Sequence, residues 1–260
     1  MNPQGRWQGR LTSRELPWED PSIDALSAEA RQELAEHWLT RGAFERRVGA
    51  AFSKIHDTLV LDGADSALQE IARRAVDDED RHAEISRQVA SRYAGRELPD
   101  PERLPISIPA HPGVSSELRR TLHIVGQCAL NETFASSVLE ASLAACEGAL
   151  AKAAIRELLS DEVDHARIGW AHLGGLSPSE KQELAPYLLP LMRINMKTWL
   201  ETPRDYPTDD RLVAHGALSL GLLRTALLSC VRDVLIPGFS HVGLPTGDLQ
   251  LWLEQGAPTS

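Results

Sequence analysis

The sequence contains little cysteine. Cys128, Cys146 and Cys230 are odd in number, and none of them forms a Cys-x-x-Cys pair. This spacing excludes a disulfide framework and offers no set of thiolates for an iron–sulfur cluster. We therefore expect three reduced thiols in the core of a cytoplasmic protein.

Long hydrophobic runs are also missing. The first twenty residues contain no apolar stretch, and the most hydrophobic later stretch, residues 217–231, is short and broken by Arg224. A membrane-spanning helix needs about 20 consecutive apolar residues. We therefore expect neither a signal peptide nor a membrane span.

Basic clusters are lacking as well. Lysine and arginine total 27 against 37 acidic residues, which gives a net charge of −10. A nucleic-acid or anionic-membrane binder needs cations that neutralise phosphates. Alternating β-branched runs are few, and no flavin or nicotinamide fingerprint is visible. The composition therefore indicates a soluble helical protein that does not bind nucleic acid.

Helical periodicity dominates what is present. Apolar residues recur in steps of three and four, which predicts four long helices at about 28–60, 65–93, 115–146 and 149–173. Two more helices are predicted at about 178–201 and 209–234, with Pro237-Gly238 ending the last one before a short tail. Five prolines within residues 99–112 exclude a helix there. We expect a long crossover at this point, as a bundle needs when its second and third helices run in the same direction.

These elements predict three parts of one chain. Residues 1–27 are expected to form an extended arm that packs on the body through Trp7 and Trp18. Residues 28–175 are expected to form the four-helix bundle, and residues 176–260 a helical extension packed on it. A chain of 260 residues is long enough for one well-packed domain.

Two Glu-x-x-His motifs are the strongest chemical signal. Glu79 and His82 lie in one predicted helix, Glu162 and His165 lie in another, and the chain contains no third copy. A spacing of three places a carboxylate and an imidazole on one helix face. Each pair also falls in the middle of the apolar stripe of its helix, so both pairs are predicted to face the core.

Two further glutamates lie on the stripes of the other two helices. Glu132 is central to one of them, and Glu45 lies on the other, where Glu36, His56 and Asp57 are alternatives. Four buried carboxylates without cations would repel one another and lose solvation. Two divalent ions remove that objection, and a set of carboxylates and imidazoles suits iron or manganese. The alternative is that these are ordinary charges on solvated helix faces.

The order Glu … Glu-x-x-His … Glu … Glu-x-x-His, with one element per helix, resembles the ferritin-like di-iron carboxylate superfamily over about residues 28–175. The resemblance implies an all-α, ferritin-like four-helix bundle with a long crossover between its second and third helices and two additional C-terminal helices. It also implies two iron ions, with manganese possible, and bridging roles for the two motif glutamates. The implied ligands are Glu45, Glu79, His82, Glu132, Glu162 and His165.

Asp78 and Asp161 stand four positions before His82 and His165. Each aspartate can lie near an imidazole and accept its free N–H, which fixes the ring orientation and raises the basicity of the ligand. This form of the motif is similar to that of oxygen-activating di-iron oxygenases. The alternative is that both aspartates are solvated surface charges.

Four other residues are candidates for the cavity beside the metals. Ser136 lies one turn beyond Glu132, where several di-iron monooxygenases carry a hydroxyl residue, and Cys128 lies one turn before it. His172 and His56 could serve as extra ligands or proton relays. The alternatives are a packing role for Ser136, a core thiol for Cys128 and structural roles for both histidines.

The resemblance implies an oxidoreductase in which reduced di-iron activates O2, as co-substrate, to hydroxylate, N-oxygenate or desaturate a small organic substrate. The electrons are expected from an external ferredoxin or reductase. The radical-generating subtype is disfavoured because Ser86 stands where its tyrosine is expected. The alternatives are a ferroxidase or iron-binding ferritin-like protein, and a bundle with metal only as a structural staple. Residues 212–231 could pack on the pocket or against a second chain in a homodimer.

Overall fold

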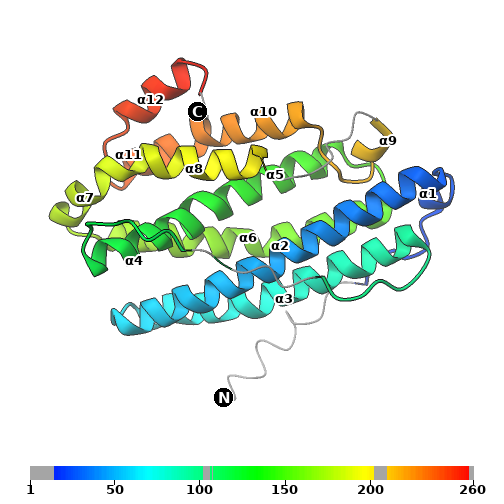
Figure 1. The fold of residues 1–260 in the computed structure, drawn as a ribbon, viewed down its shortest axis with the longest axis horizontal. Helices are drawn as coiled ribbons and strands as arrows, with labels where there is room; N and C mark the ends of the chain where they lie inside the picture. Colours follow the sequence, from blue (N-terminus) through cyan, green and yellow to red (C-terminus); the bar gives the residue numbers. More distant parts are fainter. Residues whose placement is uncertain (1–14, 102–105, 107, 202–209, 258–260) are drawn as a thin grey trace.

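The structure is a computed structural model, and it describes residues 15–101, 106, 108–201 and 210–257. Every regular element in these residues is a helix, which confirms the all-α prediction (Figure 1). None of the helices in the described ranges combines the length and the apolar character needed to cross a membrane. Trp7 and Pro105 lie outside the described residues.

Two long helices, α2 (Ala28–Leu61) and α3 (Ser66–Ala94), form an antiparallel hairpin. The side chain of Ser27 accepts a hydrogen bond from the Ala30 N–H at the start of α2, with an N–O distance of 3.2 Å. Gly95 ends α3 in the left-handed conformation at φ 67°. Both ends therefore follow signals that are readable in the sequence.

The third predicted helix is not continuous. It consists of α4 (Ser116–Ile124), the π-helical segment η2 (Val125–Asn131) and α5 (Glu132–Ala145). The π turn lies against Gly169 of α6 (Ala149–Gly175), where a β-carbon would come within 2.7 Å of Ala129 Cα. The backbones of α6 and η2 thus touch directly. The π turn ends where Glu132 begins, so it sets the direction in which that side chain leaves the helix.

The second and third long elements run in the same direction. Arg120 in α4 forms an ion pair with Asp62, the residue that follows α2, at an N–O distance of 2.6 Å. α3 and α4 therefore begin at the same end of the molecule, as Figure 1 shows. The described residues between Gly95 and Ser115 form no helix and cross back along the bundle, as the prolines predicted.

The C-terminal part has more breaks than the two predicted helices. Gly216, at φ 94°, turns the chain inside the second of them, and Pro237 lies in the first turn of a helix instead of ending one, because a proline is tolerated at that position. A final helix replaces the predicted tail. The elements are α7 (Pro178–Leu184), η3 (Ala185–Tyr187), α8 (Leu188–Glu201), α9 (Asp210–Val213), α10 (Leu220–Cys230), η4 (Val231–Leu235), α11 (Ile236–His241) and α12 (Gly247–Glu254).

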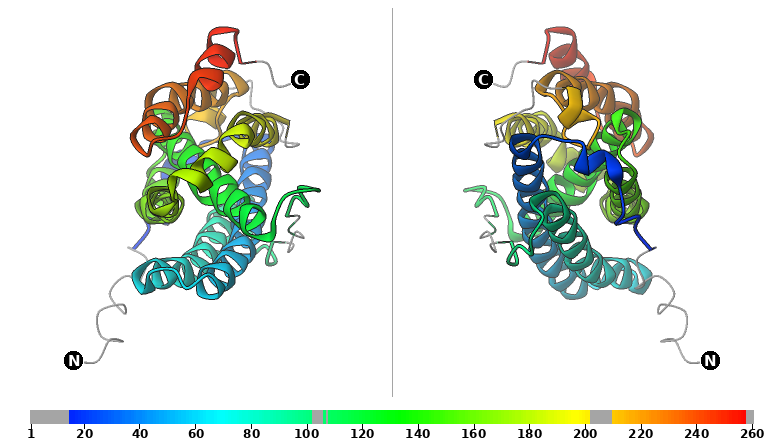
Figure 2. Two further views of the ribbon diagram at one scale, coloured as in Figure 1. Left: turned by 90° about the vertical axis from the view of Figure 1, so that its left-hand side faces the viewer. Right: turned by 90° about the vertical axis from the view of Figure 1, so that its right-hand side faces the viewer.

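The C-terminal helices share a hydrophobic core with the bundle. Leu130 and Phe134, from η2 and α5, are buried in one cluster with Met192 of α8 and Leu227 of α10. Figure 2 shows the resulting layers, with α2 and α3 at one side, α5 and α6 in the middle, and α8 and α10 at the other side. The extension thus covers α5 on the side opposite α3.

The start of the described chain packs differently from the prediction. The Trp18 side chain is 37% exposed, whereas Leu16 and Ile23 are buried. Ile23 belongs to the short helix α1 (Pro21–Asp24), and Asp20 caps this helix. Asp20 also accepts a hydrogen bond from the Leu150 N–H at the start of α6. The buried side chains of Leu16 and Ile23 and the buried cap Asp20 therefore hold this segment against the bundle, and Trp18 does not.

Candidate metal centre

The structure brings the six predicted ligand residues together in the middle of the bundle. All except Glu45, which is partly exposed, are at most 2% exposed. Their oxygen and nitrogen atoms form two overlapping groups, and within each group the atoms lie no more than 4.8 Å apart. One group is Glu45, Glu79 and His82, and the other is Glu79, Glu132, Glu162 and His165.

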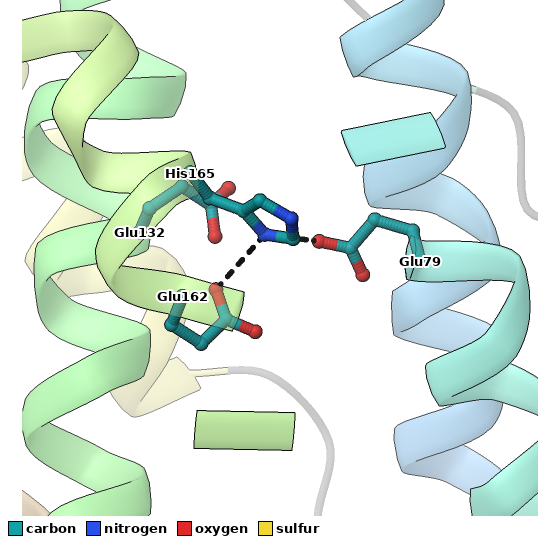
Figure 3. Close-up of side chains that lie close together, drawn as sticks. All are labelled: Glu79, Glu132, Glu162 and His165. Atoms are coloured by element: carbon teal, nitrogen blue, oxygen red, sulfur yellow. Dashed lines mark ion pairs between the residues drawn. The ribbon is translucent and has the colours of Figure 1, made fainter. Parts of the chain in front are cut away.

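Two of the carboxylates lie between the two imidazoles. Glu79 places Oε1 3.1 Å from Nδ1 of His165 and Oε2 3.6 Å from Nδ1 of His82. Glu162 does the same from the facing helix, with Oε2 3.3 Å from His165 Nδ1 and Oε1 3.7 Å from His82 Nδ1. Figure 3 shows Glu79 reaching from α3 toward Glu132, Glu162 and His165 on the other side. Each of the two carboxylates thus offers one oxygen to each of two neighbouring positions.

Several of these inward-facing atoms lack a hydrogen-bond partner. Among the described residues, both oxygens of Glu79 and the Nδ1 atoms of His82 and His165 are buried and unpaired. An unsatisfied buried polar group costs about 1–3 kcal/mol, and a charged group costs more. So many unpaired polar atoms facing the same buried space are better explained by bound cations than by a core without them.

The outer nitrogens of both imidazoles face aspartates on the opposite helix. Nε2 of His82 lies 3.1 Å from Oδ2 of Asp161, and Nε2 of His165 lies 3.6 Å from Oδ2 of Asp78. Each aspartate therefore faces the histidine across the α3–α6 contact and not the one in its own helix, and Asp161 forms a hydrogen bond there. A proton on Nε2 leaves the lone pair of Nδ1 pointing to the centre of the cluster.

Arg81 joins the two aspartates, a role that the sequence reading missed. Its guanidinium contacts Asp161, lies 3.5 Å from Oδ1 of Asp78 and lies 3.8 Å from Oε2 of Glu157. The three-residue spacing from Asp78 to Arg81 is the signal that could have indicated the contact within α3. The contact to Asp161 depends on tertiary packing and leaves no local pattern.

Burial and mutual charge shift the pKa values of the cluster. Burial and the neighbouring Glu79 raise the pKa of Glu45 to about 8. Burial, Glu162 and Glu79 likewise raise the pKa of Glu132 well above its ordinary value. Burial alone would lower the pKa of His82, but its hydrogen bond to Asp161 and the nearby negative charges of Glu79 and Glu162 raise it to about 10. Without cations, therefore, the cluster retains protons at neutral pH.

Glu132 is held by two amides of the π segment. Oε1 of Glu132 accepts hydrogen bonds from Nε2 of Gln127 at 2.5 Å and from Nδ2 of Asn131 at 3.4 Å. Asn131 in turn accepts a hydrogen bond from Nε1 of Trp199 in α8 at 3.0 Å. Neither amide was a sequence candidate, because Gln127 reaches Glu132 over five residues, a spacing that an α-helix does not bring together.

A cavity of about 230 Å³ lies beside the cluster and reaches Glu45, Glu132 and Glu162. One wall comes from α2 and another from η2 and α5, while α8 and the crossover close the remaining sides. Most of the lining is apolar. The apolar lining residues are Phe44, Val48, Ala51, Ile106, Ile108, Pro109, Leu122, Ala135, Val138, Leu139, Leu191, Ile194 and Trp199.

The four residues expected near the cavity lie elsewhere. Ala135, Val138 and Leu139, not Ser136, line it from α5. Cys128 is fully buried in an apolar cluster beside α6. His172 lies 3.3 Å from the Thr121 hydroxyl, and His56 lies beside Asp57, so neither histidine lines the cavity.

No family model matches the chain, and the searches of curated proteins and of solved structures find no match either.

Proposed function

We propose that this chain is a ferritin-like di-iron protein that uses O2 to oxidise a small organic molecule. The carrying observation is the placement of Glu79 and Glu162, each with one carboxylate oxygen toward each imidazole. With this placement, both carboxylates would help to hold two divalent metal ions. Glu45 and His82 complete one of the two positions, and Glu132 and His165 complete the other.

The residues present fit two divalent ions. Four ionised carboxylates carry four negative charges, which two divalent ions balance without any further cation. Oxygen and imidazole nitrogen donors suit iron and manganese, and a reduced di-iron pair would supply the electrons for activating O2. The orphaned atoms of Glu79, His82 and His165 gain partners when the ions bind.

The surrounding residues orient and shield the centre. Asp161 accepts a hydrogen bond from Nε2 of His82 and fixes its tautomer and direction, and Asp78 faces Nε2 of His165 at 3.6 Å. Gln127 and Asn131 hold one oxygen of Glu132, which leaves its other oxygen to face the cluster. The apolar walls of the cavity keep water away from the oxidising centre while admitting an organic molecule.

Oxygen uptake tests this function. Protein reconstituted anaerobically with Fe(II), then mixed with O2, should consume O2 at a rate that depends on the intact cluster. Glu162→Ala should lose most of this uptake, while Glu33→Ala, an exposed residue of α2, should keep it. Uptake by the iron-loaded protein no faster than that of free iron would refute the proposal. Equal uptake by Glu162→Ala would refute it too.

A further inference from the structure

The cavity carries an excess of basic side chains once the ligand carboxylates are set aside. Glu45, Glu132 and Glu162 are the acidic residues of its lining, and all three are assigned to the metals by the proposed function. The basic side chains of the lining are Arg41, Arg47, His37, His111 and His123. Arg41 and Arg47 carry the fixed positive charges of this set, and their place in the lining of one cavity, in a chain of net charge −10, needs an explanation.

Arg41 is the cation best placed to meet a ligand. It lies one helical turn before Glu45 on α2 and lines the cavity. Its guanidinium carbon lies 5.5 Å from the centre of the Trp38 ring, which stacks against it and limits its movement. Its Nε atom is buried and has no hydrogen-bond partner among the described residues.

The environment of Arg41 changes when metals bind. In the metal-free protein Glu162 and, when it is ionised, Glu45 act on the guanidinium and partly balance it. Two divalent ions would neutralise both carboxylates, and the guanidinium would then remain as an uncompensated cation against an apolar wall. Leaving a charge in such a place is costly unless an anion joins it.

A second hollow adjoins the cavity and has the same sign of charge. Ile108 and His123 line both spaces, so the two meet at these residues. Lys54, Arg119 and Arg120 line the second hollow, Asp57 is its acidic residue, and Arg120 is paired with Asp62. A positive approach of this kind attracts anions and repels cations.

We propose that the cavity binds an organic anion, a carboxylic acid with a compact apolar body, with its carboxylate on Arg41. This inference rests on the proposed function, because it places the body of the ligand beside the metals. A guanidinium matches the planar geometry of a carboxylate with two parallel N–H donors. The cavity volume is about 230 Å³, so the apolar body is limited in size.

The body of the anion then lies along Phe44, Val48 and Leu191, which line the cavity on α2 and α8. Its end distant from the carboxylate faces Glu132 and Glu162. Arg41 would thus distinguish three types of ligand by the charge of the head group, which is negative in a carboxylate, absent in an alcohol and positive in an amine. A neutral alcohol of the same length loses the pairing with Arg41, and an amine meets repulsion from the same residue.

The test measures binding and needs no turnover. Octanoate, 1-octanol and octylamine are titrated into protein loaded with Zn2+, which is redox-inert, and binding is followed by tryptophan fluorescence, since Trp199 lines the cavity. We expect octanoate to bind at least tenfold more tightly than 1-octanol, and octylamine to bind most weakly. In Arg41→Gln the preference for octanoate should disappear. The matched control is Arg31→Gln, which changes a partly buried arginine of the same helix that does not line the cavity, and it should keep the preference.

Three results would overturn the proposal: no binding of any of the three probes, equal binding of octanoate and 1-octanol, or an unchanged preference in Arg41→Gln. Circular dichroism and Zn2+ content of each variant exclude misfolding and metal loss as the cause. The outcomes separate the two proposals. Rapid O2 uptake with no preference for the anion refutes this inference alone, and a preference for the anion without O2 uptake refutes the proposed function alone.

Discussion

The imidazoles of His82 and His165 use their two nitrogens for different purposes. Nε2 of His82 faces Asp161 and its Nδ1 faces Glu79 and Glu162, so a proton on one nitrogen leaves a lone pair on the other. Because each aspartate comes from the opposite helix, the pairings also hold α3 and α6 together at the level of the cluster. Arg81 ties both aspartates into one network.

Removing one of these acceptors should weaken metal binding. Asp161→Asn keeps the shape of the side chain but can donate to Nε2, which would push the proton of His82 onto Nδ1, toward the metal position. We expect the affinity of the protein for Zn2+ to fall about 10- to 100-fold, as measured by competition with a chelator. Asp77→Asn serves as the control, because Asp77 is an exposed aspartate of α3 that pairs with Arg73 and not with a histidine of the cluster. Equal affinities of Asp161→Asn and the parent protein would contradict the pairing.

Protons and metals compete for the same atoms. The pKa values of Glu45, raised to about 8, and of His82, raised to about 10, mean that both hold protons at neutral pH before metal binds. Metal binding must displace those protons, so affinity should increase as pH rises and fall as pH drops. Zn2+ added to metal-free protein in weak buffer at neutral pH should acidify the solution by about two protons or more per chain. Binding without proton release would show that the carboxylates and imidazoles are not the ligands.

At the scale of the helices, the π segment η2 decides how the third long element presents Glu132. The sequence predicted the helix and its central glutamate, because the apolar steps of three and four continue through it. It did not predict the π turn, because that distortion comes from close contact with Gly169 on another helix. The same turn explains why Gln127 reaches Glu132 over five residues.

Two glycines of α6 offer a matched test of that contact. A β-carbon at Gly169 would lie within 2.7 Å of backbone atoms of Ala129 and Cys128, whereas nothing lies within 4 Å of a β-carbon at Gly174. Gly169→Ala should therefore lower the free energy of unfolding by about 1–3 kcal/mol and reduce metal content by displacing Glu132. Gly174→Ala should be neutral or stabilising by up to about 1 kcal/mol, because alanine favours the helix. Chemical denaturation of both variants compares them, and equal stabilities would contradict the contact.

At the scale of the whole molecule, the C-terminal helices complete the site as well as covering it. Leu191, Ile194 and Trp199 of α8 line the cavity, and Trp199 holds Asn131 beside Glu132. The sequence predicted an extension packed on the bundle but divided it into two helices, because the turn at Gly216 and the helix through Pro237 depend on packing against α5 and α6. The four long helices and the six clustered residues could be predicted because each helix has its own apolar stripe and each ligand residue lies on such a stripe.

Removal of the extension should therefore damage the bundle. A chain ending at Ser177 would expose Leu130, Phe134 and Leu173, which are buried in the cluster shared with α8 and α10. Exposed apolar patches of this kind promote aggregation. We expect most of this shortened chain to be insoluble on expression, compared with the full chain under the same conditions. A soluble, monodisperse and helical product would show that residues 28–175 fold independently.

The central claim is that Glu45, Glu79, His82, Glu132, Glu162 and His165 hold two metal ions. Elemental analysis after anaerobic Fe(II) reconstitution and removal of free metal tests it most directly. We predict two irons per chain for the parent protein and at least one fewer for both Glu79→Ala and Glu162→Ala, with helical spectra unchanged. No bound iron in the parent protein, or two irons in both variants, would contradict the account.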